Sequence, residues 1–279
     1  MSKTKIVLLI TAIAIMLVAG YKVITTVLEY KQAQNEYDSL ANYIREDSST
    51  DAEEEKTESA SEDAIVQDEP TKQLARNYNR NDFPKDGVDF DKLKEVNGDV
   101  VAWIYVGATG ISYPVVQGND NEYYLHHTFE NKKNSSGCIF IDAGDKSDLT
   151  GYNTFFYGHN MKNRTMFGSL KQFIWNEGTY DKDHYVFVYR PGMIYRYEIF
   201  SYYVDSPDSE MYYTCDDLAA FESYLDTACA KSSGECVAQP SSDDNIITLV
   251  TCSGTGAGKK RFFIHATFVD RFIYPGYGE

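Results

Sequence analysis

The sequence predicts a mainly β domain, either a sandwich or a closed barrel, carried behind an apolar N-terminal helix. The pattern becomes globular from about residue 73, and after Val96 the chain breaks into short runs rich in Val, Ile, Tyr and Phe, separated by Gly, Asn, Asp and Pro. This pattern is typical of many short strands. The hydrophobic content is 43% over 279 residues, so the chain can bury a real core and is not wholly disordered.

We expect eight strands and only short helices in this domain. The strands are predicted at Val100–Val106, Ser112–Val116, Cys138–Asp142, Thr154–Tyr157, Tyr185–Tyr189, Ile194–Val204, Asn245–Thr251 and Arg261–Val269. The helices are predicted at Asp89–Val96, Glu122–His127, Met166–Phe173 and Asp216–Ala230. Few long helices beside many strands favour an all-β architecture.

The N-terminus predicts a membrane anchor. Counted from Ile6 to Leu28, an almost uninterrupted apolar stretch runs for 23 residues, which at ~1.5 Å per residue spans ~30 Å of hydrocarbon. Lys3 and Lys5 precede it, so we expect residues 1–5 in the cytoplasm, residues 6–28 across the membrane and the rest outside the cell. The alternative is a cleaved signal peptide, because the first apolar run alone has the length of a signal sequence.

The net charge of −16 is concentrated in one segment. Residues 46–70 hold eleven acidic side chains and one lysine, with little apolar content. Burial of so few apolar side chains does not offset the conformational entropy that the segment would lose on folding. We therefore expect residues 29–72 to form a tether, helical at first and then acidic and disordered, followed by an extracellular domain over residues 73–279. The pI near 4.7 argues against nucleic-acid binding.

One cysteine lies where chemistry is expected. The predicted strand that ends at Cys252 is followed by a glycine-rich turn, and the next strand begins near Arg261. A thiol with an ordinary pKa of ~8.5 is mostly protonated at neutral pH, so a nearby base matters. His159 follows another strand-like run, and the Arg261 guanidinium is suited to hold a developing oxyanion. The alternative is a buried cysteine with an unrelated histidine and arginine.

These residues resemble those of the sortases, the membrane-anchored cysteine transpeptidases of Gram-positive bacteria. The stretch Thr248-Leu249-Val250-Thr251-Cys252, with an arginine opening the next strand, is the hallmark of that family. The wider resemblance is to class B and runs from about residue 88 to 272. It is carried by Asn97–Ile104, Tyr113–Gly118, Asn121–His127, Tyr157–Met161 and Met166–Leu170, in the family's order.

The resemblance implies both a fold and a mechanism. The fold is an eight-stranded barrel with peripheral helices, one of them at Asp216–Ala230 between the sixth and seventh strands. Cys252 resembles the nucleophile that attacks the threonine carbonyl of a sorting signal and forms a thioester. His159 resembles the general acid and base, and Arg261 the residue that steadies the oxyanion. An amine of a peptidoglycan precursor then resolves the thioester, and no cofactor is needed.

The resemblance also implies partners and a binding groove. The partners are surface proteins that carry a sorting signal, and the groove is lined by Asn121, Leu125 and Tyr157. Class B enzymes usually have Ser two residues before the nucleophile and an acidic residue after it, where this chain has Val250 and Ser253. The preferred sorting motif is therefore not implied.

Two other functions stay open. A pilin-polymerising sortase would use a lysine of the next pilin as its amine, and the lack of a lid-like aromatic motif in residues 46–72 favours wall anchoring. A non-enzymatic, membrane-tethered protein would bind ligands through a tyrosine-rich face. The C-terminal residues 274–279 hold no sorting motif, apolar stretch or basic tail, so the chain does not resemble a sortase substrate.

The remaining candidates are interpreted as structural. Cys138 lies in a stretch, Ser135–Ile139, that resembles the nucleophile motif of L,D-transpeptidases, but we expect a buried strand cysteine. Packing and hydrogen bonding account for His126 and His127, His265 is interpreted as structural, and His184 as the start of a surface strand. No His, Cys and carboxylate cluster has metal-ligand spacing. One disulfide is possible among Cys215, Cys229 and Cys236.

Overall fold

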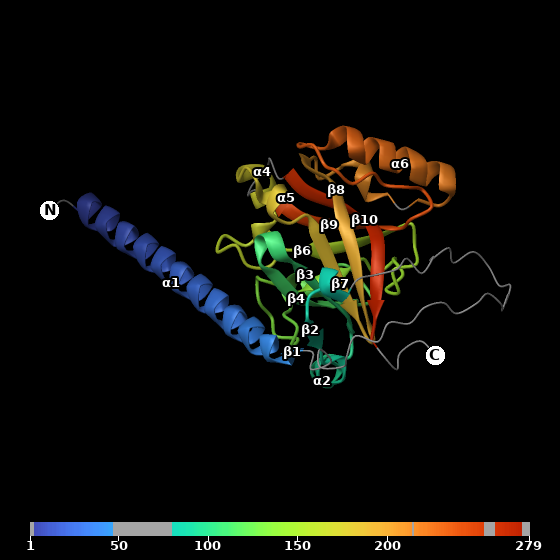
Figure 1. Cartoon of the computed structure of the whole chain (residues 1–279). Helices are drawn as coiled ribbons and strands as arrows, with labels where there is room; N and C mark the ends of the chain where they lie inside the picture. The colour runs from blue at the N-terminus through green and yellow to red at the C-terminus, as the bar shows by residue number, and fades with distance from the viewer. Residues whose placement is uncertain (1–2, 47–79, 214, 254–259, 275–279) are drawn as a thin grey trace, which may run out of the picture.

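The computed structural model describes residues 3–46, 80–213, 215–253 and 260–274, and its centre is a closed eight-stranded β-barrel (Figure 1). The barrel strands are β3 (Val100–Val106), β4 (Ile111–Val116), β5 (Ile139–Ile141), β6 (Asn153–Gly158), β7 (Tyr185–Arg190), β8 (Met193–Asp205), β9 (Ile246–Ser253) and β10 (Lys260–Ile273). Their order around the barrel is β10-β8-β7-β3-β4-β5-β6-β9. The predicted eight-stranded barrel is confirmed.

Two parallel pairings interrupt an otherwise antiparallel barrel. β4 pairs with β5, and β6 with β9, in parallel, while the other neighbours are antiparallel. In the second parallel pair, Tyr157 lies opposite Val250 and Gly158 opposite Thr251. The carboxyl ends of β6 and β9 therefore meet at the same edge of the barrel, and the residues that follow each strand lie close together.

Short helices cover the barrel. They are α2 (Phe90–Val96), α3 (Tyr123–His126), α4 (Gln172–Trp175), α5 (Thr179–Lys182) and α6 (Leu218–Lys231). The 3-10 turns are η1 (Ala41–Tyr43), η3 (Arg80–Asp82), η4 (Gly107–Thr109), η5 (Phe167–Ser169) and η6 (Glu210–Tyr212). The helix expected over residues 166–173 is split between η5 and α4, and α5 was not predicted. A four-residue helix is too short to leave a periodic pattern.

Helix α6 shows how an amphipathic sequence covers the barrel. The Asp217 carboxylate caps its first turn by accepting a hydrogen bond of 2.8 Å from the Ala220 amide. The buried side chains Phe221, Tyr224, Leu225 and Ala228 recur at helical spacing and pack on a second core cluster outside the barrel centre. Figure 1 shows α6 across one end of the molecule, between the sixth and seventh barrel strands in chain order.

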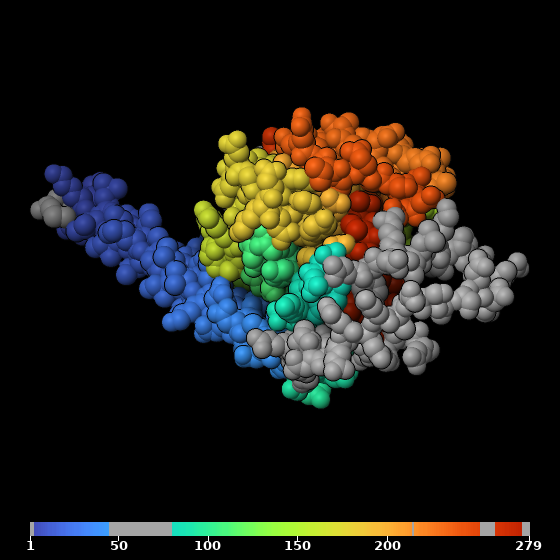
Figure 2. All heavy atoms as spheres, in the orientation of Figure 1, coloured from blue at the N-terminus to red at the C-terminus, as the bar shows by residue number. Residues whose placement is uncertain are grey.

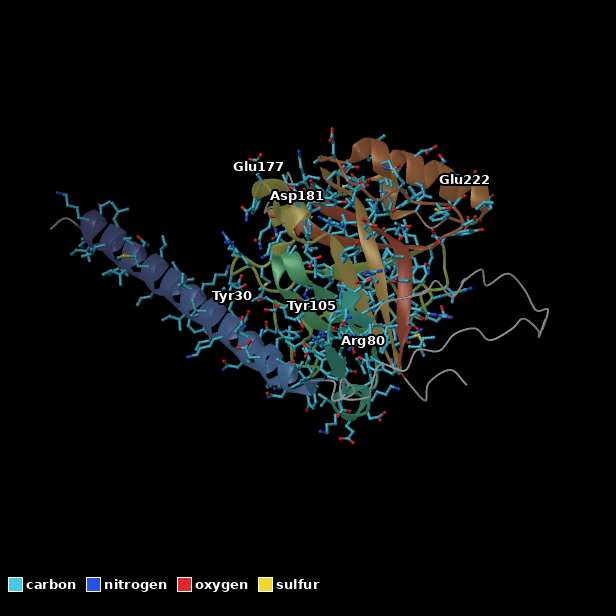
Figure 3. All side chains as sticks on the ribbon, in the orientation of Figure 1. Tyr30, Arg80, Tyr105, Glu177, Asp181 and Glu222 are labelled. Carbon is cyan, nitrogen blue, oxygen red and sulfur yellow. The ribbon has the colours of Figure 1, made fainter. Side chains whose placement is uncertain are left out.

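The first half of α1 (Lys3–Leu40) projects away from the barrel (Figures 1 and 2). Its most apolar window has a mean hydropathy of 2.4 and none of it is buried. Length and composition therefore suffice for a membrane span, although an N-terminal signal sequence meets the same test. In Figure 3 no other described element lies beside this half of the helix.

The second half of α1 packs on the barrel. Ala33, Glu36, Tyr37 and Leu40 are buried at helical spacing, and Tyr30 marks the approach of the helix to the barrel in Figure 3. After η1, strand β1 (Ile44–Glu46) pairs with β2 (Asp86–Val88). Residues 29–46, which we assigned to a tether, are thus part of the folded domain. The acidic stretch that we expected to be disordered lies almost wholly outside the described residues.

Candidate active site

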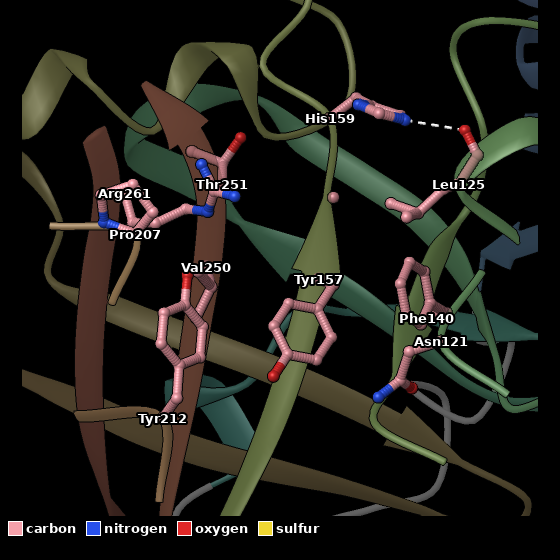
Figure 4. A pocket seen from close by; sticks show the side chains of 11 residues that line it. Asn121, Leu125, Phe140, Tyr157, His159, Pro207, Tyr212, Val250, Thr251 and Arg261 are labelled. Carbon is pink, nitrogen blue, oxygen red and sulfur yellow. Dashed lines mark hydrogen bonds between the residues drawn. The ribbon is translucent and has the colours of Figure 1, made fainter. Parts of the chain in front are cut away.

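A pocket of about 380 Å³ lies at the carboxyl ends of β6 and β9. Its walls are formed by Asn121, Leu125, Phe140, Tyr157, Gly158, His159, Pro207, Tyr212, Val250, Thr251 and Arg261. Figure 4 shows Arg261 and Thr251 on one side of the pocket, Leu125, Phe140 and Asn121 on the other, and Tyr157 between them. Five of the six residues named from the sequence line this one pocket, and the sixth is Cys252.

The strand registers bring the predicted trio to this edge. β9 and β10 are antiparallel, and Cys252 is paired directly with Arg261. β6 and β9 are parallel, and Gly158 on β6 is paired with Thr251 on β9. His159 and Cys252 are the residues that follow this pair, so their backbones lie at the same level of the barrel edge. Neighbouring strands lie about 4.8 Å apart, so the three backbones are close in space although the residues are far apart in sequence.

Two polar atoms in the pocket wall are buried without a hydrogen-bond partner among the described residues. They are Nη1 of Arg261 and Oγ1 of Thr251. An unsatisfied buried donor typically costs ~1–3 kcal/mol, and native structures keep few of them. A guanidinium N–H held in this way is prepared to donate to an oxygen atom of a bound molecule.

His159 is held by a backbone carbonyl. Its Nε2 lies 2.7 Å from the carbonyl oxygen of Leu125 (Figure 4). Because a carbonyl oxygen only accepts, Nε2 carries the proton and Nδ1 is the basic nitrogen of the neutral ring. Burial lowers the pKa of His159, which outweighs the raising effect of the Leu125 carbonyl, and the charge of His126 lowers it further. The ring is therefore mainly neutral at pH 7 and able to accept a proton.

Asp142 organises the opposite wall of the pocket. One of its carboxylate oxygens accepts hydrogen bonds from Nδ2 of Asn121 at 2.9 Å and from the Tyr157 hydroxyl at 3.2 Å. The Asn121 side-chain oxygen accepts from the Ala143 amide at 2.8 Å, which fixes the orientation of the Asn121 amide. Burial and the Asp142 charge raise the pKa of Tyr157, so its hydroxyl stays protonated.

Sequence reasoning missed Asp142 and three further wall residues. Phe140 comes from β5, and Pro207 and Tyr212 come from the segment after β8. The only signal for this segment was the turn sequence at residues 206–208, which does not reveal what the turn faces. Each of these residues reaches the pocket through a tertiary contact that no local pattern predicts.

Two of the residues interpreted as structural, Cys138 and His127, are held by burial or ring stacking. Cys138 is 1% exposed, and burial raises the pKa of its thiol to about 12, so it is no reactive thiol. Among the described cysteines, Cys138, Cys215, Cys229 and Cys236 are free thiols, so the possible disulfide is not formed. His127 stacks on Tyr123 with ring centroids 4.1 Å apart. Within the described ranges, no three metal-ligating side chains gather at one place.

Comparison with known proteins agrees with this geometry. The model of the sortase domain family matches residues 104–269, more than half of the chain. The chain is 37% identical to sortase B of Listeria monocytogenes over 168 residues, which is 57% of this chain and 65% of that protein, a little under two thirds of its length. It is 25% identical to sortase B of Staphylococcus aureus over 244 residues, 87% of either chain.

A solved structure gives the same relationship. The crystal structure of Clostridium perfringens sortase B superposes with a TM-score of 0.61 at 36% identity, covering 65% of this chain and 100% of that one. The family match over residues 104–269 includes every residue that lines the pocket. The chain therefore belongs to the sortase family, as a member of the sortase B type.

Proposed function

We propose that this chain is a cysteine transpeptidase that cleaves a sorting signal after threonine and transfers the protein to an amine. Cys252 is the nucleophile. Its sulfur attacks the threonine carbonyl carbon, and its proton passes to Nδ1 of His159. The C–N bond then breaks, the departing amine takes the proton from His159, and a thioester remains on Cys252.

The second half of the reaction reverses these steps with a new amine. The incoming amine attacks the thioester carbonyl and gives a proton to His159, which returns it to the departing thiolate. Both tetrahedral intermediates carry an oxyanion, which the Arg261 guanidinium stabilises. The observation that carries this proposal is the buried Nη1 of Arg261, unpartnered among the described residues, in the same pocket as His159 and directly paired in register with Cys252.

The groove determines which peptide is bound. Asn121 and Tyr157 present hydrogen-bonding groups held by Asp142, and Leu125 and Phe140 supply apolar surface. An extended peptide bound with its threonine carbonyl near Arg261 would lie along this wall. We assign substrate binding to Asn121, Leu125 and Tyr157, and take the substrates to be surface proteins that carry a sorting signal.

We also propose that residues 6–28 of α1 anchor the chain in the cell membrane, with Lys3 and Lys5 in the cytoplasm and the barrel outside the cell. The side chain of Ser135 and that of Asn134 bind Glu29, the first residue after this apolar stretch, at 2.9 and 3.0 Å. A barrel loop thus lies where α1 leaves the membrane. The site is then near a membrane-associated peptidoglycan precursor, which supplies the amine.

The test uses the full chain in detergent or lipid nanodiscs. A fluorogenic peptide bearing a sorting motif and a peptidoglycan-type amine should give a transpeptidation product. Cys252→Ala should abolish the product, since the covalent route is lost. Cys229→Ala, which removes another free thiol that is exposed, serves as the control and should retain activity.

Alternative functions are outcomes of the same test. Product formation with a pilin lysine peptide, but not with a peptidoglycan amine, would replace wall anchoring by pilin polymerisation. Activity that survives Cys252→Ala would overturn the assignment of the nucleophile. A folded chain that binds peptides but forms no product with any amine would instead fit a surface binding protein.

A further inference from the structure

The docked half of α1 is hydrogen-bonded to the loop over residues 127–138, which adjoins the pocket. The Tyr37 hydroxyl donates to the carbonyl oxygen of Gly137 at 2.6 Å, and both groups are buried. The Glu36 carboxylate, 5% exposed, accepts from the Thr128 hydroxyl and from the Glu130 amide, each at 2.9 Å. Two adjacent helix residues therefore hold both ends of this loop.

A first chain of contacts leads from Tyr37 to His159 through Gly137. Gly137 has a φ of +58°, and a Cβ atom added there would lie 3.0 Å from the Leu125 carbonyl oxygen and 3.1 Å from Cδ2 of His159. That carbonyl is the one that binds Nε2 of His159. Gly137 is thus packed between the Tyr37 hydroxyl on one side and the imidazole with its acceptor on the other.

A second chain of contacts reaches the same histidine from its backbone. The Tyr37 ring packs edge-on against Tyr113, with centroids 5.3 Å apart. The Tyr113 hydroxyl accepts a hydrogen bond of 3.2 Å from the Met166 amide. Met166 is bridged to Asn160, the residue after His159, and the following amide of residue 167 donates to the His159 carbonyl at 3.0 Å.

We propose that Tyr37 is a positioning residue for His159, so that the docked half of α1 belongs to the working active site. The two contact chains start from different parts of one side chain, the hydroxyl and the ring, and they meet on the imidazole and on the backbone of the same residue. This inference rests on the role of His159 in the proposed transpeptidation. Tyr37 itself touches no reacting atom and acts through the loop.

The physical reason is the precision that proton transfer requires. If the Tyr37 hydroxyl is removed, the buried Gly137 carbonyl loses its donor, and the loop must shift or admit water to satisfy it. A shift of the Leu125 carbonyl moves Nε2, and with it the direction in which Nδ1 faces the thiol. Displacements well below 1 Å matter when a base must lie within hydrogen-bond reach of a proton.

The test compares two Tyr→Phe variants of the full chain in detergent. Tyr37→Phe removes the hydroxyl and keeps the ring packed on Tyr113. Tyr180→Phe is the control, because the Tyr180 hydroxyl also donates to a buried backbone carbonyl, that of Ile199 at 3.0 Å, outside both contact chains. This hydroxyl accepts a further hydrogen bond of 3.0 Å from the Val237 amide, so its removal is at least as disruptive locally as that of the Tyr37 hydroxyl. We expect kcat to fall about tenfold in Tyr37→Phe with KM changed less than about twofold, and both constants to stay near wild type in Tyr180→Phe.

A second measurement does not need activity. The pKa of His159, followed by NMR of its ring protons, should be lower in Tyr37→Phe than in wild type, since the Leu125 carbonyl favours the protonated ring. It should be unchanged in Tyr180→Phe. An inactive wild-type chain with this pKa difference would refute the proposed function and leave the contact chain standing.

Three results would overturn the positioning role. They are an unchanged kcat in Tyr37→Phe, an equal loss of kcat in both variants, and an unmoved His159 pKa. Thermal unfolding of each variant identifies a temperature at which the wild type and both variants are folded. The kinetic constants are compared at that temperature. A loss confined to KM belongs to the first of these results, because it leaves kcat unchanged and would place Tyr37 in peptide binding.

Discussion

Two histidine environments, one on β10 and one just after β6, differ in the completeness of their hydrogen bonding. His265 on β10 is fully buried; Nδ1 lies 2.9 Å from the Thr248 hydroxyl and Nε2 2.9 Å from the Tyr203 hydroxyl. The Thr248 hydroxyl donates onward to Asn153 at 2.8 Å, so it accepts from Nδ1, and the neutral ring carries its proton there. His159 carries its proton on the other nitrogen, Nε2.

The difference contrasts one end of the β9–β10 pair, whose side chains are closely hydrogen-bonded, with the other end, where we propose that the chemistry takes place. Around His265 each ring nitrogen has a partner, and burial lowers its pKa to about 3. In the pocket, Arg261 and Thr251 keep buried polar atoms that have no partner among the described residues. We therefore expect the closed network to contribute mainly to protein stability, and the unpartnered atoms to contribute mainly to the proposed binding of a ligand. The following predictions separate the contribution of each end to folding stability from its contribution to catalysis.

The largest expected effect is that of Arg261→Ala on catalysis. Losing one oxyanion donor should lower kcat by about 10²–10³. The unfolding temperature should change little, because Nη1 has no partner among the described residues to lose. Steady-state kinetics and differential scanning fluorimetry on the same samples check both statements. Arg261→Lys should restore little of the activity lost in Arg261→Ala, since an ammonium group does not reproduce the planar set of guanidinium donors.

A matched control for this variant is Arg271→Ala, near the other end of β10. It should keep kcat within about twofold of wild type, as expected for a residue remote from the reacting atoms. An Arg261→Ala enzyme that loses stability but not activity would reverse the proposed division between the two regions.

His265→Leu should have the opposite effect to Arg261→Ala, a loss of folding stability with little loss of activity. It strips the Tyr203 and Thr248 hydroxyls of their partner and should cost about 2–4 kcal/mol of folding stability, with kcat nearly unchanged at temperatures where the variant is folded. Chemical denaturation measures the loss. A stable variant that is inactive would place His265 in the catalytic machinery instead.

The pH dependence of stability offers a further test of His265. Its folded-state pKa of about 3 lies below the ordinary value of about 6.5, so the unfolded chain binds the proton more readily. The stabilisation is therefore complete above pH ~6.5 and is lost as pH falls toward ~3, by about 1.4 kcal/mol per pH unit. In His265→Leu this part of the slope should vanish. An identical slope in both proteins would contradict the assignment.

The smallest expected effects come from a pair of threonines on β9. Thr248→Val removes a donor to Asn153 and an acceptor from His265, and should cost about 1–2 kcal/mol. Thr251→Val removes a buried hydroxyl that has no partner among the described residues, and should be neutral or slightly stabilising. Denaturation midpoints of the two variants check the difference. Equal losses of stability would show that the side chains at the pocket end of β9 are hydrogen-bonded as completely as those at the other end.

The sequence predicted the barrel because strands leave a local signal. The β3 bounds agree with the expectation, and each of the other barrel strands overlaps the predicted one. The pairing of Cys252 with Arg261 joins two strands that are separated by only six residues in the sequence, which is also a local relationship. Asn121, Leu125 and Tyr157 were assigned to a groove by resemblance; all three line the pocket, and their role in substrate binding stays a prediction.

The features that were missed depend on distant contacts. The Tyr37 hydroxyl binds a residue 100 positions away, and Glu36 binds residues more than 90 positions away. A stretch with Glu, Asp, Gln and Asn resembles a solvated tether until its partner surface is known. Asp142 was overlooked for the same reason, since its two partners lie 15 and 21 residues away.

The central claim, that Cys252 forms a thioester with a sorting signal, is tested most directly by trapping the intermediate. The full chain is mixed with a sorting-signal peptide without an acceptor amine, quenched in acid and examined by intact-mass and peptide mass spectrometry. We expect a mass increase equal to the peptide fragment ending in threonine, located on Cys252 and removed by hydroxylamine. An adduct on another residue, or product formation without any adduct, would contradict the account.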